Sequence, residues 1–367
     1  MVRASQPAAL PELTVNHVEF YVADALQQAA QFAAEYGFDP FATSGELGGH
    51  SDHFSIALRQ GGIVLVVTEP RSADHPAHSY VSAHGDGVAD IALRTTDARA
   101  AFGRAVEGGA RPLTPPAQPD GSPGGLTAAI QGFGDVRHTF VQAPDRVGDK
   151  VFLPGFPYTA ELAPHAGAGL LDIDHFAVCL HPGTIDAAVT FYESALGFRL
   201  VFEEQIGVGT QAMRSRVVQN ESRTVTLTLI EPDPASDPGQ IDAFLDSHRG
   251  EGVQHIAFRT DDVVGTVSTL GERGVRFLRT PDSYYDLLGK RLTPTGHTTE
   301  DLRRLHVLAD EDHGGQLFQI FTQSTHPRRT FFLEIIERLG ANTFGSSNIK
   351  ALYEAVEAER VKTGILS

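Results

Sequence analysis

The sequence predicts an α+β protein built as two tandem domains, and three observations lead to this prediction. The chain has 367 residues, of which 41% are hydrophobic, so it can bury a large core and its length suits at least two domains. Segments with strand alternation and segments with helical periodicity follow one another along the chain. The second half also repeats the order of the first half, which indicates an internal duplication.

The duplication is visible in two pairs of segments. LTVNHVEFYVADALQQAAQFAAEYGFDPF, which begins at Leu13, resembles LDIDHFAVCLHPGTIDAAVTFYESALGFRLVF, which begins at Leu171. Each predicts a strand, an amphipathic helix and a Gly-Phe turn into another strand. GDGVADIALRTTDARAAFGRAVEGGARPLTPP from Gly85 aligns in the same way with GEGVQHIAFRTDDVVGTVSTLGERGVRFLRTP from Gly250. Each half therefore holds two strand-helix-strand units, which makes four modules in two domains.

Composition predicts where the domains begin and end. Residues 1–12 form an N-terminal tail, and residues 13–153 form the first domain. The stretch PGFPYTAELAPHAGAG, residues 154–169, is rich in Pro, Gly and Ala without periodicity, which is typical of a linker. Residues 170–345 form the second domain, where the runs TVTLTLIEP and QLFQIFT predict strands of an antiparallel or mixed sheet. Residues 346–367 form a C-terminal helix and tail.

The predicted C-terminal helix has a cap and an apolar face. Ser346, Ser347 and Asn348 in SSNIKALYEAVEAER are residues that cap helices, and apolar residues follow them at helical spacing. One face of this helix must therefore pack on another part of the protein. We expect it to cover the second domain.

Charge and motifs exclude several classes of function. A net charge of -17, from 29 Lys+Arg against 46 Asp+Glu, disfavours nucleic acid and anionic membrane surfaces as partners. The N-terminal MVRASQPAALPELTV lacks the apolar run of a signal peptide or membrane span. Cys179 is the one cysteine, so no intrachain disulfide can form and a reducing cytoplasm fits best. The motifs GxGxxG, GxxxxGK[ST] and GxSxG are absent, which argues against nucleotide binding and serine hydrolysis.

Three polar residues stand in otherwise apolar strands of the second half: His175 in LDIDHFAVCL, His255 in GVQHIAF and Glu334 in TFFLEIIER. Strand alternation puts Ala177 and Ala257 on the faces of the two histidines, where small side chains leave room. A lone carboxylate in an apolar strand is costly to bury as an ion unless a cation or several donors compensate it. Two imidazoles and one carboxylate form the facial triad of non-haem Fe(II) oxygenases. The sequence therefore predicts a metal site built on three strands.

The first half does not keep this set. In GVADIAL, Asp90 takes the place of His255, whereas His17 remains at the position that matches His175. The first half is therefore interpreted as a degenerate copy without a metal. Either histidine of the second half alone would more simply be a core residue hydrogen-bonded to backbone, so the prediction depends on the three residues together. Alternation further predicts that Gln254 lies on the face opposite His255.

Two other polar stretches are weaker candidates for a site. GGHSDHF, with His50 and His53, is typical of a surface loop. ADEDHGG, from Ala309 to Gly315, predicts the solvated tip of a hairpin, with Gly314 and Gly315 in the turn, rather than a second metal site.

The modules and the strings GVQHIAF, QLFQIFT, FFLEIIER and FGSSNIKALYEAVE resemble the 4-hydroxyphenylpyruvate dioxygenase group of the vicinal oxygen chelate superfamily, from about Leu13 to Arg360. The resemblance implies paired βαβββ modules that form open, glyoxalase-like barrels, with the metal in the second domain. It implies that His175, His255 and Glu334 bind Fe(II). It also implies that O2 is the co-substrate, without 2-oxoglutarate, because the substrate carries its own keto acid. By the same resemblance the terminal helix gates the site, and a homodimer is compatible.

The family has two branches that share the substrate 4-hydroxyphenylpyruvate and differ in product. One hydroxylates the ring and forms homogentisate; the other hydroxylates the benzylic carbon and forms 4-hydroxymandelate, a source of 4-hydroxyphenylglycine for peptide antibiotics. The ring hydroxylases typically carry strings like PINEP and GNF, where this chain has TLIEP and SNI. Thr228, Ile230 and Ile349 at these departures are expected to set the product. They favour the mandelate branch, as do NHVEFYV, SIALRQG, HGDGVADIAL and DEDHGGQLFQIFT. Homogentisate formation in tyrosine catabolism is the alternative.

The resemblance also assigns polar substrate contacts and apolar walls around the aryl ring. The polar contacts are Ser215, Thr228, Gln240 and Gln319, and the walls are Phe332 and Phe344. The alternative for each is ordinary strand polarity or plain core packing. Two further classes on the same scaffold stay open: a metal-dependent isomerase or ring-cleaving dioxygenase with the same triad, and a metal-free binding module.

Overall fold

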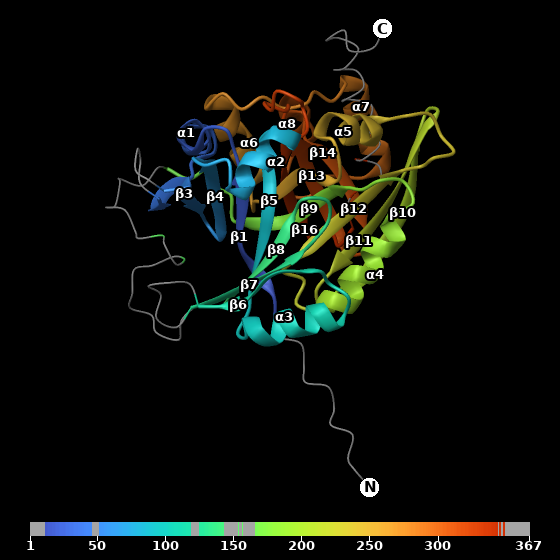
Figure 1. Cartoon of the computed structure of the whole chain (residues 1–367). Helices are drawn as coiled ribbons and strands as arrows, with labels where there is room; N and C mark the ends of the chain where they lie inside the picture. Colours follow the sequence, from blue (N-terminus) through green and yellow to red (C-terminus); the bar gives the residue numbers. More distant parts are fainter. Residues whose placement is uncertain are drawn as a thin grey trace.

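The structure is a computed structural model, and it describes residues 12–45, 51–118, 125–142, 153, 156, 166–343, 345 and 348. Most of the predicted linker, the N-terminal tail and almost all of the predicted C-terminal helix lie outside these residues. Two eight-stranded sheets form the body of the described chain, one from each half (Figure 1). None of the described helices combines the length and apolarity that crossing a membrane requires.

The first half contributes eight strands and three helices. In chain order they are β1 (Thr14–Tyr21), α1 (Ala25–Tyr36), β2 (Asp39–Ser44), β3 (His53–Gln60), β4 (Ile63–Pro70), α2 (Pro76–His84), β5 (Gly87–Arg94), α3 (Ala98–Glu107), β6 (Pro112–Ala117), β7 (Leu126–Gln131) and β8 (Arg137–Gln142).

The second half repeats this order and adds two helices, α7 and α8, before its last hairpin. Its elements are β9 (Asp172–Cys179), α4 (Ile185–Leu196), β10 (Arg199–Val208), β11 (Gln211–Gln219), β12 (Thr226–Pro232), α5 (Gln240–His248), β13 (Gly252–Arg259), α6 (Val263–Glu272), α7 (Asp282–Arg291), α8 (Thr299–Leu305), β14 (Leu308–Asp312), β15 (Gly315–Phe321) and β16 (Phe332–Leu339).

Both sheets have the same strand order, which confirms the duplication. The first runs β2-β3-β4-β1-β5-β8-β7-β6, and the second runs β10-β11-β12-β9-β13-β16-β15-β14. In each, the first strand of the half pairs with the fifth in antiparallel fashion and with the fourth in parallel. Each half is therefore a pair of strand-helix-strand modules joined at its two central strands, and the curled sheets form the predicted open barrels of an α+β fold.

The matching helices α1 and α4 end on the same signal, although only α1 begins with a side-chain cap. The Asp24 side chain caps α1 by accepting a hydrogen bond from the backbone N–H of Gln27 at 2.9 Å. The helices α1 and α4 end at Gly37 and Gly197, whose φ angles of 76° and 69° lie in the left-handed region that favours glycine. The predicted Gly-Phe turns are thereby confirmed.

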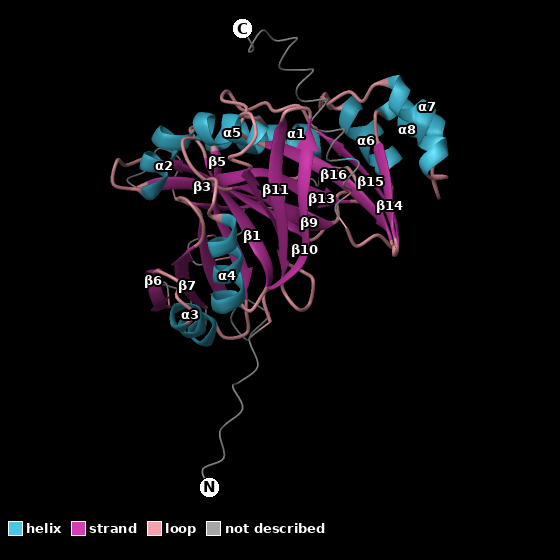
Figure 2. Cartoon of the chain, turned by 90° about the vertical axis from the view of Figure 1, so that its right-hand side faces the viewer, coloured by secondary structure: helices cyan, strands magenta, loops and turns pink. Residues whose placement is uncertain are grey.

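Apolar residues of both halves join in one hydrophobic core, so the halves pack directly on each other. Figure 2 shows α3 and α4 together at one end of the strands, and the remaining helices along the opposite edge. On that opposite edge the rings of His84 and His248, the last residues of α2 and α5, stack with centroids 4.3 Å apart. The His138 imidazole also hydrogen-bonds the Tyr192 hydroxyl across the halves at 2.8 Å.

Candidate metal centre

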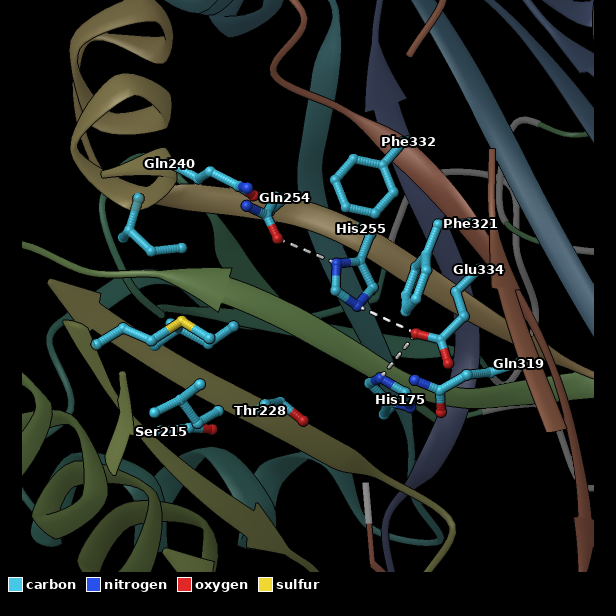
Figure 3. Close-up of a pocket in the computed structure, with 14 residues that line it drawn as sticks. His175, Ser215, Thr228, Gln240, Gln254, His255, Gln319, Phe321, Phe332 and Glu334 are labelled. Carbon is cyan, nitrogen blue, oxygen red and sulfur yellow. Dashed lines mark hydrogen bonds and ion pairs between the residues drawn. The ribbon is translucent and has the colours of Figure 1, made fainter. Parts of the chain in front are cut away.

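His175, His255 and Glu334 meet inside the second sheet, where their ligating atoms all lie within 4.8 Å of one another. Glu334 Oε2 lies 3.4 Å from His175 Nε2 and 3.3 Å from His255 Nε2 (Figure 3). All three side chains are buried, with exposed fractions of 5%, 6% and 2% respectively. The residues predicted from three distant strings are thus side by side.

Strand register explains why these side chains converge. The central strands β9 and β13 pair so that Ala257 faces His175 and Ala177 faces His255. The parallel pairing of β13 with β16 then sets Ala257 beside Glu334. Each histidine therefore has an alanine as its cross-strand neighbour, and the small side chains leave the space that three ligands need.

A β-bulge precedes each histidine and supplies its orienting partner. The β9–β13 register shifts around Asp174 and around Gln254, so each of these residues is the extra one in its strand. Asp174 Oδ1 accepts a hydrogen bond from His175 Nδ1 at 2.8 Å, and Gln254 Oε1 accepts one from His255 Nδ1 at 3.1 Å. Both rings consequently aim Nε2 at Glu334. Residues that accept a hydrogen bond from a metal-binding histidine fix the orientation and the tautomer of its ring.

Electrostatics in the site favour a bound cation. Burial opposes charge on the His175 imidazole, but Glu334 and Asp174 outweigh it and raise the His175 pKa to about 9. Burial lowers the pKa of His255, which favours the neutral imidazole that binds metals. Glu334 keeps a lowered pKa despite its burial because His175 lies beside it. Arg338 donates to Asp174 at 2.7 and 2.8 Å, which keeps this outer carboxylate ionised.

Glu334 also has an unsatisfied carboxylate oxygen, which a bound metal would satisfy. Its Oε1 is buried and has no hydrogen-bond partner among the described residues. A buried carboxylate oxygen without donors is destabilising unless a cation compensates it. Two imidazole nitrogens and a carboxylate with an unsatisfied oxygen are a donor set that suits a divalent iron ion. The residues therefore fit the predicted metal.

The pocket around the triad contains the predicted substrate residues that the structure describes. They are Ser215 on β11, Thr228 and Ile230 on β12, Gln240 on α5, Gln319 on β15 and Phe332 on β16. Phe344 and Ile349 lie outside the described residues. Thr228 Oγ1 and Gln319 Oε1 are buried without a partner in the described part of the chain, so both are available to a ligand. The cavity between these residues has a volume of about 50 Å³.

Five lining residues were not predicted from the sequence: Ile206, Met213, Ile241, Gln254 and Phe321. Phe321 was within reach, because it lies two positions after Gln319 on the same strand and so shares its face. The prediction for Gln254 was wrong. It assumed strict alternation, whereas the bulge turns Gln254 to the side of His255 and into the pocket.

The matching place in the first half holds a charge network instead of a ligand set. His17 and Asp90 occupy the predicted positions, and Arg137, paired with Asp90 across β5 and β8, stands between two carboxylates. Arg137 donates to Asp90 at 2.8 Å and to Glu19 at 2.8 Å. Thr139 donates to Asp90 through its hydroxyl and, at 3.0 Å, through its backbone N–H. The carboxylates here are compensated by the chain itself.

A second group of ligand-type side chains consists of Asp52, His53 and His75, near the predicted surface loop. His53 begins β3 and donates to Asp52 at 2.7 Å, while Asp52 is exposed and His50 lies outside the described residues. His75 caps α2 by accepting a hydrogen bond from the backbone N–H of Ala77 at 3.2 Å. These contacts account for the group without a metal.

The acidic stretch near the end of the chain forms the tip of the β14–β15 hairpin, as predicted, with Asp312 opposite Gly315. Asp312 accepts backbone hydrogen bonds from Gly314, Gly315, Asn342 and Thr343. Burial opposes these bonds, but together they lower the Asp312 pKa to about 2. The hairpin tip thereby holds the segment that follows β16.

Comparisons with known proteins agree with the fold. Residues 12–154 match the family described as "Hydroxyphenylpyruvate dioxygenase, HPPD, N-terminal", and residues 172–320 match "Glyoxalase/Bleomycin resistance protein/Dioxygenase superfamily". The chain is 34% identical to the 4-hydroxyphenylpyruvate dioxygenase of Dictyostelium discoideum, over 96% of this chain and 99% of the relative. It is also 34% identical to the enzyme of that name from Caenorhabditis elegans, over 96% of this chain and 93% of the relative.

A solved structure is similar over the whole length. It is a triple mutant of 4-hydroxymandelate synthase from Streptomyces coelicolor, with 44% identity and a TM-score of 0.87, covering 96% of this chain and 100% of that chain. The full-length likeness to two kinds of enzyme on one scaffold fits the duplicated sheets described above. The chain therefore belongs to the 4-hydroxyphenylpyruvate dioxygenase family.

Proposed function

We propose that the chain is an Fe(II)-dependent dioxygenase that converts 4-hydroxyphenylpyruvate and O2 into 4-hydroxymandelate and CO2. The observation that carries the proposal is the buried set of His175, His255 and Glu334, with its unsatisfied carboxylate oxygen. The reaction balances without another reductant. The keto acid loses its carboxylate as CO2, one oxygen atom of O2 enters the new carboxylate, and the other becomes the benzylic hydroxyl.

In this proposal the two Nε2 atoms and the Glu334 carboxylate hold the iron. A bound Fe(II) would supply the electrons and the coordination positions needed to activate O2 and to hold an α-keto acid. The chain supplies the orientation: Asp174 and Gln254 fix both imidazoles, and Arg338 fixes Asp174.

The polar residues of the pocket divide into two groups that suit the two ends of the substrate. Gln319 lies beside Glu334 and His175, whereas Ser215, Thr228 and Gln240 lie farther from the triad, toward the opposite side of the pocket (Figure 3). We assign Gln319 to the keto-acid end and the other three to the phenol hydroxyl. The walls Phe321 and Phe332 exclude water around the reacting carbons, and fixed orientation then decides which carbon reacts.

The choice of 4-hydroxymandelate as the product is supported by the departures at Thr228 and Ile230, both of which line the pocket. It is supported further by the higher identity to the mandelate synthase, 44%, than to the dioxygenases quoted above, 34%. Ile230 adds an apolar branched side chain where the ring hydroxylases carry an asparagine, and this changes how an aryl ring packs. Homogentisate formation is the second candidate, because those relatives carry that family name over the full chain.

The deciding experiment loads the protein with Fe(II) under argon, adds 4-hydroxyphenylpyruvate and then O2, and identifies the product by chromatography. We expect 4-hydroxymandelate, which would supply 4-hydroxyphenylglycine synthesis for a peptide antibiotic. Homogentisate as the main product would overturn the assignment, and no turnover would leave the isomerase, ring-cleaving or metal-free binding classes. Ile230→Asn should divert part of the product to homogentisate, and Val201→Asn, at an exposed position, is the matched control.

The proposal also covers the cellular compartment and the oligomeric state of the protein. The buried, single cysteine Cys179 suits a reducing cytoplasm, and homodimer formation stays a prediction. Sedimentation analysis of the purified protein would measure the oligomeric state.

A further inference from the structure

The helices α2 and α5, one from each half, meet at their C-terminal ends. They have nine residues each, hold matching places in the duplication and end at His84 and His248. The rings of these two buried histidines stack with centroids 4.3 Å apart and 16° between the planes. Each histidine also contacts the aromatic ring four residues earlier, Tyr80 at 4.8 Å and Phe244 at 5.0 Å. These four rings form a continuous column across the boundary between the halves.

His84 also binds the end of α5 directly. The carbonyl groups in the last turn of a helix have no partner within the helix. His84 Nδ1 donates to the backbone carbonyl oxygen of His248 at 2.7 Å, and the other ring nitrogen, Nε2, lies 2.8 Å from Asp135 Oδ2. Asp135 belongs to the first half and fixes the orientation of the ring. One residue of the first half therefore both stacks on α5 and satisfies a carbonyl group at its C-terminal end.

Close packing on the two sheets fixes the ring column. Gly252, which begins β13, leaves room for the His248 ring, because a Cβ at this position would lie 2.5 Å from that ring. At the other end of the column, the Tyr80 hydroxyl donates to the backbone carbonyl oxygen of Val88 on β5 at 2.8 Å. The column is thus attached to β5 in the first half and to β13 in the second, so α5 cannot shift without breaking these contacts.

The opposite end of α5 carries residues of the metal pocket. Its first two residues, Gln240 and Ile241, line that pocket (Figure 3). Farther along the helix, Phe244 belongs to one apolar cluster with Ile230, another residue of the same pocket. His248 lies about 12 Å along the helix axis from Gln240, at 1.5 Å per residue. A hydrogen-bonded helix of this length moves as one body, so contacts at His248 set the position of Gln240.

We infer that His84 is a positioning residue for the substrate pocket and acts on it through α5. The inference rests on the proposed function, in which Gln240 binds the phenol end of 4-hydroxyphenylpyruvate. The half that lacks the ligand set thereby takes part in holding the substrate, although His84 is not among the described residues that line the pocket. A displacement of α5 moves Gln240 away from the phenol and leaves the metal ligands, which stand on β9, β13 and β16, in place.

Substitutions at His84 test this role in the iron-loaded protein. His84→Ala removes the ring and the hydrogen bond, and we expect the KM for 4-hydroxyphenylpyruvate to rise severalfold while kcat and iron content stay the same. His84→Asn keeps an amide donor near the position of Nδ1 and should recover part of the change in KM. His78→Ala, at an exposed position of α2, is the matched control and should alter none of these values.

A purely structural role for His84 predicts a different result. The free energy of unfolding and the active fraction of the enzyme would then fall, but the KM would not change, and this outcome would overturn the inference. If His84→Ala does not fold, His84→Phe replaces it, because phenylalanine keeps a ring in the column and removes the hydrogen bond. The KM should then rise less than the loss of both contacts would cause, and an unmodified KM would again overturn the inference.

Hydrogen exchange provides a readout without turnover. In the metal-free protein, the backbone amides of α5 should exchange faster in His84→Ala than in the unmodified chain, whereas those of α1 should not change. Unchanged exchange in α5 would overturn the positioning role. Faster exchange in α5, together with an unmodified protein that fails to oxidise 4-hydroxyphenylpyruvate, would overturn the proposed function and leave the hold of His84 on α5 supported.

Discussion

The three central strands carry a charge network in the first half and the candidate metal ligands in the second half. In the first half, Arg137 lies between Asp90 and Glu19 and neutralises both with hydrogen bonds. In the second half, the position that matches Arg137 is Phe332, and no described cation touches the free oxygen of Glu334. One sheet therefore satisfies its buried carboxylates with its own residues, and the other leaves one carboxylate oxygen of Glu334 without a partner among the described residues.

This difference teaches how two copies of one fold can satisfy buried carboxylates in different ways. A buried carboxylate needs compensation in either case, and an arginine or a metal ion supplies it equally well to the fold. Only the metal leaves coordination positions for reactants. The comparison leads to tests that remove the compensating charge from one half at a time.

The largest effect is expected from Glu334→Gln, which keeps the size of the side chain and removes its charge. Residues that hydrogen-bond to metal ligands contribute roughly 10–100-fold to metal affinity. Loss of a direct ligand should reduce iron affinity by more than this, and turnover should fall with it. Iron content after reconstitution and the initial rate measure both. Thr139→Val, at the matching position of the first half, is the control and should bind iron fully. Full iron content in Glu334→Gln would contradict the ligand assignment.

Arg137→Met should mainly affect stability. It leaves Asp90 and Glu19 without their cation, and breaking a buried ion pair costs about 3–5 kcal/mol. Because the arginine is partly exposed, we expect the lower end of this range in the free energy of unfolding, measured with urea. Iron content should not change. Arg137→Lys should lose less stability. An Arg137→Met variant with unchanged stability and reduced iron content would contradict the roles given to the two halves.

Asp174→Asn tests the bulge residue that orients the His175 ring. The amide no longer attracts the proton on His175 Nδ1 as strongly, and Arg338 loses its ionic partner. Iron affinity should fall by about 10–100-fold, measured by competition with a chelator. Asn16, the bulge residue beside His17, offers the matched control, and Asn16→Ala should leave iron affinity unchanged. Equal losses in the two variants would mean that the bulges act on the fold alone.

The smallest effect is expected at the contact between the two halves, where the rings of His84 and His248 stack. Burial and the adjacent His84 lower the His248 pKa to about 4, below the 6.5 of an unfolded histidine. The unfolded chain therefore binds more protons between these values, and stability present above pH 6.5 is lost as the pH falls toward 4. The loss should be on the order of 2 kcal/mol. Urea unfolding across this range should show a flatter pH slope for His248→Phe, whereas exposed His78→Phe should keep it.

Much of this comparison could be predicted from the sequence. Alternation in GVQHIAF and FFLEII places a polar residue on a buried face, and the duplication shows which copy kept it. The ligand set thus follows from local patterns plus the repeat. The polar residues of β11, β12 and β15 could be assigned only through resemblance, because many harmless strand residues have the same pattern.

Other features depend on pairing between distant strands and could not be predicted. The bulges at Asp174 and Gln254 exist only in the register of β9 with β13, so the orientation of Gln254 was beyond a rule of alternation. The stacking of His84 on His248 depends on how the two halves pack. No short stretch of sequence encodes that packing.

The spread of the three ligands along the chain has a consequence for the lifetime of the folded protein. Each comes from a strand that is remote from the other two in sequence and lies beside them in the sheet. An ion held by all three is a removable cross-link that closes two long loops, and it binds the native sheet in preference to the unfolded chain. Such an ion would therefore raise the temperature at which the second sheet melts, and a chelator would lower it.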